Sequence, residues 1–309
     1  MKPRLVLMDV DTGIDDALAL ILLKSFENVK VLGVSTVVGN TSLENATRNT
    51  AYILDQLNWD IPLAKGSAKP LAQEPVDEGT AHGSGGLGNV SVVNPKPRPV
   101  VDLFTLYQTA LESANDPVSI IATGPLTNIA KVLSALPHLK SKIERISIMG
   151  GAVNMGNRTP STEFNIIADP EAAQVVFNAG VPITLAMLDV TYQAYLTWDE
   201  LDALRERPGS KDNELVDMLE FYINGYRNRT HLPGAPLHDS VAVAALLRPE
   251  LFTSIDAYVE VDCTFGYTRG TTIVDGRNML HRRPNATVLT HIQREAFIQL
   301  TLDSTRVYR

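Results

Sequence analysis

Short apolar runs alternate along this chain with segments whose apolar residues recur at helical spacing. Each run ends in a polar or glycine residue, as buried strands of a parallel sheet do. The pattern predicts helices at 15–25, 43–57 and 125–136, and strands at 5–10, 29–39, 119–124, 145–151 and 182–188. This alternation indicates an α/β fold with an open, mostly parallel, doubly wound sheet flanked by helices.

Two further helices have boundaries that the sequence marks. In ADPEAAQVVFNAG, Asp169 is suited to cap a helix, Pro170 fits its first position and Gly180 suits its end. In LTWDE, Thr197 and Glu200 are spaced as a capping box. We therefore expect one helix to begin after Asp169 and another after Thr197.

The stretches 66–99 and 152–162 are rich in proline and glycine and predict long loops. Long loops within compact domains are often functional. The sequence contains no internal repeat, no low-complexity tract and no obvious linker. We expect a single domain over residues 1–309.

Composition limits the classes of partner. The net charge of −8 argues against nucleic acid, and the densest basic patch is HRRP at 281–284. No apolar run has the eighteen or so residues of a membrane span, and the run before Asp9 is too short for a secretory signal. The one cysteine, Cys263, allows neither an internal disulfide nor a zinc–cysteine cluster. We expect a cytoplasmic protein without membrane or nucleic-acid partners.

Candidate chemistry begins at MDVDTGIDDALAL, where Asp9, Asp11, Asp15 and Asp16 lie between an apolar run and a helical one. Ligands of parallel α/β sheets bind beyond the carboxyl ends of the strands, which is where the first two carboxylates fall. Buried carboxylates repel one another unless they bind protons or a cation. With no cysteine or histidine nearby, the oxygen ligands favour Ca²⁺ or Mg²⁺ over zinc.

Two other interpretations of this segment remain open. In the first, Asp15 caps the helix and the other carboxylates are solvated. In the second, DxD followed by threonine resembles the phosphatases of the haloacid dehalogenase superfamily. That superfamily has DxDGT, whereas here the order is Asp11-Thr12-Gly13.

Further polar residues stand in four other segments. ATGPLTN ends a strand at Thr123, whose carbonyl is left without a helical partner, and PLHDSVAVAAL carries His238 and Asp239 at the start of an apolar helix. A Gly-rich loop, GTAHGSGGLGN, bears His82, and the segment before Asp169 bears Asn157, Glu163 and Asn165. Taken singly, each also has a structural interpretation as a cap, a loop contact or a surface side chain.

Together with DVDTGIDD, the segments GPLTN, EFNI–DPEAA and HD resemble the nucleoside hydrolase family of the inosine–uridine preferring type. The resemblance extends from Asp9 to YTRGTTIVDGR at 267–277. It implies the nucleoside hydrolase fold and hydrolysis of the N-glycosidic bond of ribonucleosides to ribose and free base, for nucleoside salvage. Family precedent implies a homodimer or homotetramer.

The resemblance also implies a Ca²⁺ held by Asp11, Asp16, Asp239 and the main-chain carbonyl of Thr123. Asp11 would be the general base for a calcium-bound water, and His238 the proton donor to the leaving base. Asp9 would orient the ligands from outside the first shell. Ribose would be bound by Asp15, Asn40, Met149, Asn157, Glu163 and Asn165.

On the base side, the resemblance points to His82, Tyr222 and Tyr226. The two tyrosines are four residues apart and share a helix face, although they are equally compatible with ordinary packing. Trp59 and Trp198 lie outside the pocket segments, which disfavours a subtype that stacks purines between tryptophans. The glycines at 79, 83, 85, 86 and 88 make the His82 segment a candidate lid, together with 222–235.

Two alternatives for the function remain. One is hydrolysis of another ribosyl compound, such as nicotinamide riboside or a modified nucleoside, by the same ribose and metal groups. The other is a catalytically silent ribose-binding protein. Because a binder needs neither a base nor an acid, the full set of Asp11, Asp16, Asp239 and His238 argues against it.

Overall fold

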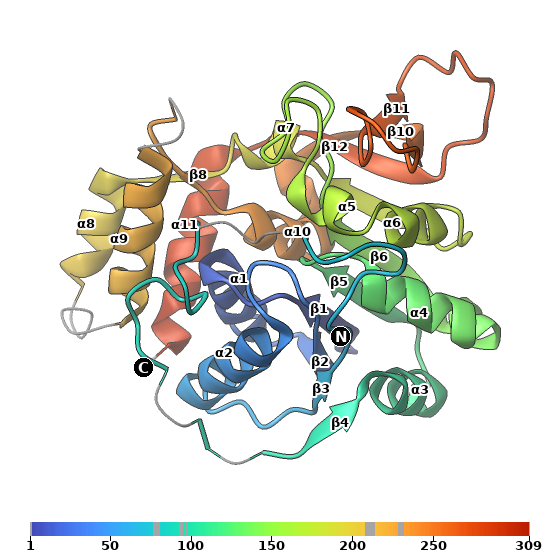
Figure 1. Cartoon of the computed structure of the whole chain (residues 1–309). Coiled ribbons are helices and arrows are strands. Elements are labelled where there is room, and N and C mark those ends of the chain that lie inside the picture. Colours follow the sequence, from blue (N-terminus) through green and yellow to red (C-terminus); the bar gives the residue numbers. More distant parts are fainter. Residues whose placement is uncertain are drawn as a thin grey trace.

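The computed structural model describes residues 2–76, 81–92, 95–96, 98–207, 214–227 and 232–308. Ten strands within these residues form one sheet, and Figure 1 shows it running through the molecule. Its order is β11 (Thr272–Asp275), β10 (Phe252–Val261), β12 (Ala286–Ile292), β7 (Ile183–Ala186), β6 (Ile143–Met149), β5 (Val118–Ala122), β1 (Arg4–Val10), β2 (Val29–Thr36), β3 (Leu63–Lys65) and β4 (Val100–Asp102).

The sheet is parallel from β4 to β12, and antiparallel pairs join β12 to β10 and β10 to β11. The prediction of a mostly parallel α/β sheet is therefore confirmed. All five predicted strands are present, with ends that differ from the prediction by at most three residues. Strands from both ends of the chain share this sheet, which supports a single domain. The single domain itself stays a prediction.

Helices cover both faces of the sheet. Along β1, Val6 and Met8 point into one apolar cluster and Leu7 points into the other. The first cluster packs under α1 (Ile14–Lys24), α2 (Leu43–Gln56), α9 (Glu214–Arg227), α10 (His238–Leu247) and α11 (Arg294–Ser304). The second packs under α3 (Leu103–Ser113), α4 (Thr127–Ala135) and α6 (Pro170–Phe177). This is the doubly wound arrangement expected from the alternating pattern.

Helices α1 and α10 are apolar on nearly all sides because they are buried on nearly all sides. They pack against each other, and α9 and α11 cover α1 from outside. Both helices begin with acidic residues, so their packing brings Asp15 and Asp16 towards Asp239. No described helix is long and apolar enough to cross a bilayer.

The two predicted helix starts are confirmed. Asp169 accepts a hydrogen bond from the Ala172 N–H at 3.1 Å and precedes α6, with Pro170 first in the helix. Thr197 and Glu200 form the capping box of α8 (Trp198–Arg205). At α1 the capping carboxylate is Asp16, which accepts from the Gly13 N–H at 2.8 Å, so the alternative interpretation in which Asp15 caps this helix is wrong.

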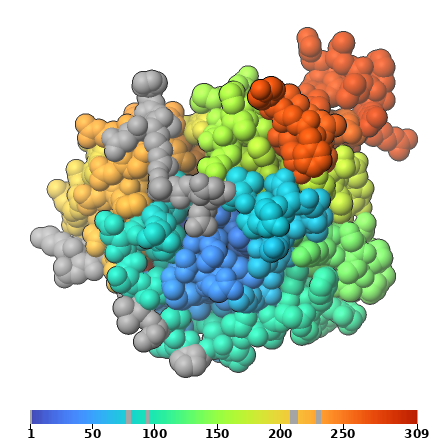
Figure 2. All heavy atoms as spheres, viewed as in Figure 1, coloured from blue at the N-terminus to red at the C-terminus, as the bar shows by residue number. Residues whose placement is uncertain are grey.

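The predicted loops 66–99 and 152–162 contain no helix or strand among their described residues. The antiparallel end of the sheet lies at the opposite end from β4. Figures 1 and 2 show the segment between β11 and β12, in red-orange, standing out from the body of the molecule. The remaining short elements are α5 (Phe164–Ala168), α7 (Leu188–Thr191) and a hairpin of β8 (Tyr195–Thr197) with β9 (Gly234–Pro236).

Candidate active site

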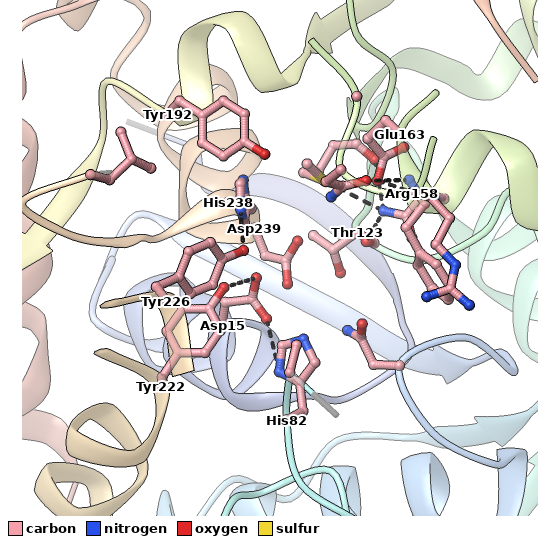
Figure 3. A pocket seen from close by; sticks show the side chains of 18 of the residues that line it. Asp15, His82, Thr123, Arg158, Glu163, Tyr192, Tyr222, Tyr226, His238 and Asp239 are labelled. Carbon is pink, nitrogen blue, oxygen red and sulfur yellow. Dashed lines mark hydrogen bonds and ion pairs between the residues drawn. The ribbon is translucent and has the colours of Figure 1, made fainter. Parts of the chain in front are cut away.

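Loops beyond the carboxyl ends of the central strands β1, β2, β5 and β6 surround a cavity of about 560 Å³. That volume lies within the usual range for small-molecule sites. Figure 3 shows carboxylates at its centre, aromatic rings on one side and Glu163 on the other. The lining residues are Asp15, Asn40, Ala81, His82, Thr123, Met149, Met155, Gly156, Asn157, Arg158, Glu163, Phe164, Asn165, Tyr192, Tyr222, Tyr226, Leu232, His238 and Asp239.

Three carboxylates converge at the bottom of this cavity. One oxygen from each of Asp15, Asp16 and Asp239 lies within 4.8 Å of the other two. All three residues are at most 4% exposed, and Asp9 and Asp11 are fully buried. The interpretation in which these carboxylates are solvated is therefore wrong.

Burial and mutual repulsion make this cluster unfavourable for negative charge. Burial raises the pKa of Asp239 well above its usual range, and the charges of Asp15 and Asp16 raise it further. Burial also raises the pKa of Asp15 to about 6, against a hydrogen bond from Tyr222 that lowers it. Carboxylates in this state bind protons or a cation.

The site fits a hard divalent cation on its own geometry. Asp15 Oδ1 and Asp239 Oδ2 are buried oxygens without a hydrogen-bond partner, and both residues belong to the converging cluster. An all-carboxylate donor set is the kind that Ca²⁺ and Mg²⁺ prefer. A cation here would satisfy these oxygens and remove the repulsion among them.

Asp11 lies beneath this cluster and outside the cavity lining. Its Oδ2 accepts the Asn40 N–H at 2.6 Å, and the Asn40 side chain donates to Asp11 Oδ1 and Asp16 Oδ2 at 3.3 and 3.2 Å. Burial raises the pKa of Asp11 well above its usual range, and the charge of Asp16 adds to this effect. A carboxylate with a raised pKa is a suitable proton acceptor near neutral pH.

The backbone packs closely against Asp11. A Cβ atom on Gly39 would lie 2.0 Å from Asp11 Oδ2, and one on Gly124 would lie 3.0 Å from Asp11 Cβ. Only glycine lets the loops after β2 and β5 approach the carboxylate so closely. These loops therefore fix the position of Asp11.

Thr123, directly after β5, contacts the cluster through its side chain. Its hydroxyl donates to Asp16 Oδ1 at 2.7 Å. Its carbonyl oxygen accepts from the Asn165 side chain at 2.7 Å, although a carbonyl keeps a second lone pair for another partner. The structure thus adds a contact at this carbonyl that the sequence did not predict.

Asp9 lies behind the site rather than in it. Its Oδ1 accepts from the Asn128 side chain at 2.8 Å and from the Ser35 hydroxyl. Burial raises the pKa of Asp9 to about 7 despite these hydrogen bonds. Asp9 therefore ties β1 to β2 and α4, which is a supporting position of the kind expected for it.

Glu163 and Asn165 form the side of the cavity opposite the aromatic rings. Glu163 caps α5 by accepting from the N–H groups of Asn165 and Ile166, and it also accepts from the Gly151 N–H at 3.0 Å. Burial raises the pKa of Glu163 to about 7. The Asn165 side chain also donates to the Met149 carbonyl at 3.1 Å. Asn157 accepts from the Phe164 N–H at 2.9 Å and keeps this loop against the cavity.

Aromatic rings line the side of the cavity opposite Glu163. Tyr222 and Tyr226, one turn apart on α9, meet edge to face with centroids 5.0 Å apart, and His82 stacks on Tyr222 at 5.5 Å. The Tyr222 hydroxyl donates to Asp15 Oδ2 at 3.1 Å. His82 Nδ1 accepts from the Ile14 N–H at 3.1 Å, so this loop histidine is anchored to the start of α1. Both tyrosines are therefore part of the cavity wall.

His238 is held through both of its ring nitrogens. Nδ1 lies 2.7 Å from the Thr191 hydroxyl, and Nε2 lies 2.8 Å from the Tyr226 hydroxyl. Burial lowers the pKa of His238 to about 3, so the ring is neutral near pH 7. Tyr192 packs edge-on against the same ring, with centroids 5.6 Å apart. The contacts of the two ring nitrogens with Thr191 and Tyr226 fix the plane of the imidazole.

The sequence analysis missed several residues of the cavity. Tyr192, Met155, Arg158 and Phe164 line it, and Thr191 supports it from behind. Thr191 and Tyr192 follow a predicted strand closely, and this position could have identified them as candidate site residues. Trp59 and Trp198 pack against the core and do not line the cavity, as expected. Gly79 and residues 228–231 of the candidate lid lie outside the described residues.

Comparison with known proteins agrees with this geometry. Residues 6–299 match the family described as inosine–uridine preferring nucleoside hydrolase. The chain belongs to this family. The pyrimidine-specific ribonucleoside hydrolase RihA of Escherichia coli strain K12 is 38% identical over 307 residues, which cover 98% of both chains.

Solved structures of this family share the fold. The purine-preferring ribonucleoside hydrolase of Gardnerella vaginalis aligns with a TM-score of 0.89 at 31% identity, over 99% of this chain and 98% of that one. A plant nucleoside hydrolase, PpNRh1, aligns at 0.87 and 28% identity, over 99% of each chain. The nucleoside hydrolase fold is confirmed, and the chain is an N-glycosyl hydrolase. The phosphatase interpretation of DxDT is wrong.

Proposed function

We propose that this nucleoside hydrolase cleaves ribonucleosides to ribose and free base with a bound Ca²⁺, and that pyrimidine nucleosides are its preferred substrates. The observation that carries the proposal is the cluster of Asp15, Asp16 and Asp239 at the bottom of a cavity with an aromatic wall. The 38% identity to a pyrimidine-specific hydrolase supports the base preference.

Asp11, Asp16, Asp239 and the Thr123 carbonyl are the proposed ligands. Calcium, when bound, supplies positive charge that lowers the pKa of a water ligand. Asp15 belongs to the converging cluster as well, so it lies beside the cation while it binds the ribose. The proposed ligands come from the ends of β1 and β5 and the starts of α1 and α10.

Asp11 is the proposed general base. Two N–H donors of Asn40 orient its carboxylate, and burial raises its pKa towards the range in which a carboxylate takes up a proton. Asn40 donates to both Asp11 and Asp16, so it fixes the position of the general base relative to one of the proposed metal ligands. The carboxylate accepts the proton of the attacking water as the new C–O bond forms.

Ribose binds between the carboxylates and the Glu163 side in this proposal. Asp15 and Asn165 bind the 2′- and 3′-hydroxyls, with help from Asn40, Asn157, Glu163 and the Met149 backbone. Polar groups this close to the sugar favour a transition state in which the ring gains positive charge. The base then projects towards Tyr222, Tyr226 and His82, which lie together on one side of the cavity in Figure 3.

Protonation of the leaving base is assigned to His238 together with Tyr226. Because His238 is neutral and its Nε2 contacts the Tyr226 hydroxyl, the pair has one mobile proton between these two atoms. Tyr226 lines the cavity and gives its hydroxyl proton to the departing base as the C–N bond breaks. The phenolate then takes up a proton from solvent, which balances the proton that Asp11 has taken from the water. Cleavage of the C–N bond therefore releases a neutral base.

The experiment that tests the proposal measures reducing sugar released from inosine, uridine, adenosine, cytidine and nicotinamide riboside, with Ca²⁺ and with chelator. Release from uridine and cytidine that requires the cation supports it. Release from nicotinamide riboside alone favours the other ribosyl compounds, and ribose binding without any release favours the silent binder. Release that persists in chelator contradicts the role of the cation.

Three further expectations stay predictions: a role in nucleoside salvage, a cytoplasmic location, and a homodimer or homotetramer. None of them enters the chemistry above.

A further inference from the structure

Tyr192 lies in the wall of the cavity with a hydroxyl group that the steps proposed above do not use. It follows α7 directly, and its ring packs edge-on against His238 with centroids 5.6 Å apart. The same ring packs against the apolar cluster under α1 and α10, so it is held from behind. Figure 3 shows its hydroxyl directed into the cavity, between His238 and Glu163.

Three tyrosines line the cavity among the described residues, and the protein itself engages the hydroxyl groups of two of them. The hydroxyl of Tyr222 donates to Asp15 Oδ2 at 3.1 Å, and that of Tyr226 lies 2.8 Å from His238 Nε2. In the part of the chain that the structure describes, the Tyr192 hydroxyl has no hydrogen-bond partner. A hydroxyl that faces a cavity in this way is available to a ligand.

This hydroxyl keeps its proton. Burial raises the pKa of Tyr192 above its usual value, and the negative charges of Glu163 and Asp189 raise it further. The group is therefore protonated near neutral pH and can act as a hydrogen-bond donor. The influence of Glu163 also agrees with the position of the hydroxyl towards the Glu163 side of the cavity.

The position of Tyr192 is tied to the loop that leads to Glu163. Asp189, three residues before Tyr192, accepts from the N–H groups of Val153 and Asn154 at 2.8 and 3.0 Å. These contacts fasten α7 to the loop after β6, and the same loop continues to Glu163. The two side chains therefore border one part of the cavity in a fixed relation.

The ribose orientation proposed above decides which part of the substrate meets this hydroxyl. In a β-nucleoside the base and the 5′-carbon leave one face of the sugar ring, and the 2′- and 3′-hydroxyls lie on the other face. With these two hydroxyls at the carboxylates and the base at the aromatic wall, the 5′-hydroxyl points away from the cluster and across the ring from the base. Tyr192 and Glu163 border that region in Figure 3.

The two side chains offer complementary partners to a hydroxyl group. Glu163 acts as an acceptor throughout, since its oxygens accept from the N–H groups of Gly151, Asn165 and Ile166. Its remaining lone pairs can accept from one more donor. A 5′-hydroxyl placed between the two can donate to Glu163 and accept from Tyr192, so that none of the three groups is left unpaired.

We propose that the Tyr192 hydroxyl donates a hydrogen bond to the 5′-oxygen of the substrate and makes the enzyme selective for ribosides with a free 5′-hydroxyl group. This inference rests on the proposed function, from which it takes the orientation of the ribose. A riboside without the 5′-hydroxyl leaves the Tyr192 donor and a Glu163 acceptor facing a methyl group, which is costly inside a cavity. Tyr192 thus selects the sugar, whereas Tyr222 and Tyr226 act at the base.

Two substrates and one substitution test this contact. kcat/KM is measured for uridine and for 5′-deoxyuridine, with calcium, in the wild type and in Tyr192→Phe. We expect the wild type to prefer uridine by about 100-fold or more. Tyr192→Phe should lower kcat/KM for uridine by about 10-fold but change that for 5′-deoxyuridine by less than about 2-fold, because this substrate cannot form the bond.

Tyr195→Phe is the matched control. It makes the same substitution three residues further along the chain, at a side chain that does not line the cavity. It should leave kcat/KM unchanged for both substrates. A loss that is confined to uridine and to Tyr192→Phe therefore reports the contact with the 5′-oxygen rather than a general effect on the fold.

A binding measurement keeps the inference testable if no nucleoside is cleaved. Calorimetry compares methyl β-ribofuranoside with its 5-deoxy analogue on the calcium-loaded protein, where no reaction is needed. The wild type should bind the first ligand more tightly, and Tyr192→Phe should reduce this preference by about 10-fold. This pattern without any cleavage supports the contact of Tyr192 while it contradicts the proposed hydrolysis. An equal effect of the substitution on both ligands overturns the inference.

Three kinetic results also overturn it. The first is an equal loss of kcat/KM for both substrates in Tyr192→Phe, which assigns the hydroxyl to the base or to the support of His238. The second is an unchanged kcat/KM for uridine in this variant. The third is a preference for uridine that persists in Tyr192→Phe and disappears in Asn157→Ala, which assigns the 5′-oxygen to the Asn157 amide.

Discussion

The hydroxyl group of Tyr226 lies 2.8 Å from Nε2 of His238, a ring whose other nitrogen is 2.7 Å from the Thr191 hydroxyl. These contacts join α9, α10 and α7 behind the aromatic wall of the cavity. Because His238 is buried and neutral, the mechanism we propose brings the proton for the leaving base through this set of contacts rather than from an exposed imidazolium.

Removing the Tyr226 hydroxyl tests this arrangement. Tyr226→Phe should lower kcat on uridine by about 10²-fold or more, the usual contribution of a general acid. It should have little effect on a riboside such as p-nitrophenyl riboside, whose leaving group needs no proton. Tyr222→Phe, one turn away, is the matched control: it removes a hydrogen bond to Asp15 and should affect both substrates alike. Equal losses on both substrates in Tyr226→Phe would contradict the assignment.

Asp11→Asn tests the general base. The amide oxygen can still accept the Asn40 N–H, so the fold should persist while the capacity to take up a proton is lost. We expect kcat to fall by about 10²–10⁴-fold on every cleaved nucleoside. Asp60→Asn, an exposed acid outside the cavity, should leave kcat unchanged. Near-normal turnover in Asp11→Asn, measured as reducing sugar, would assign the base elsewhere.

Metal-free stability should fall as the pH rises. Burial raises the pKa of Asp9 and Glu163 to about 7 and that of Asp15 to about 6, so each favours folding below its unfolded value near 4 and loses that contribution as the pH passes its folded value. The lowered pKa of His238 acts in the opposite direction, because its contribution is complete above pH 6.5 and is lost towards pH 3. The carboxylates outnumber the histidine, so Tm in chelator should decrease from pH 5 to pH 8.

Calcium should reverse this trend. Binding at about 1,000 times its dissociation constant adds about 4 kcal/mol to the free energy of unfolding. The rise in Tm should be larger at pH 8 than at pH 5, since protons compete for the same carboxylates. Asp239→Asn should reduce the rise at both values. A shift in Tm that does not depend on pH would argue that the cation binds outside the acidic cluster.

Gly39→Ala tests how tightly Asp11 is held. A Cβ atom at residue 39 would lie 2.0 Å from Asp11 Oδ2, so the carboxylate or the loop must move. We expect weaker calcium binding by calorimetry and a kcat at least about 10-fold lower, since small displacements of catalytic groups are costly. Gly85→Ala is the control, because a Cβ atom there meets no atom within 4 Å. Normal calcium affinity in Gly39→Ala would show that Asp11 does not depend on this packing.

The sequence was sufficient for the parallel core of the fold and for the ends of its capped helices. Buried strands such as 5–10 are apolar except for one residue, here Asp9, and caps such as Asp169 act on residues three positions away. The antiparallel end was missed because β10 begins with five exposed or half-exposed residues and has no continuous apolar run. Strand β3 and strand β4 were missed because each is only three residues long.

Candidate site residues were found wherever several polar groups crowd one short segment, as at 9–16. Thr191 and Tyr192 were missed because their role depends on where α7 places them against His238, 46 or more residues later in the chain. The hydrogen bond from Asn165 to the Thr123 carbonyl likewise joins residues 42 positions apart. Such contacts follow from the packing of whole elements, which local patterns do not encode.

The packing of α1 on α10 also governs the order in which the molecule assembles. Asp239 lies 223 residues after Asp16 in the chain, so it is synthesised long after Asp15 and Asp16 and joins them only then. A contact between such distant residues closes late, because the loop between them must first be ordered. The acidic pair at the start of α1 therefore stays incomplete on a growing chain, and the proposed cation can bind the full cluster only once α10 has packed on α1.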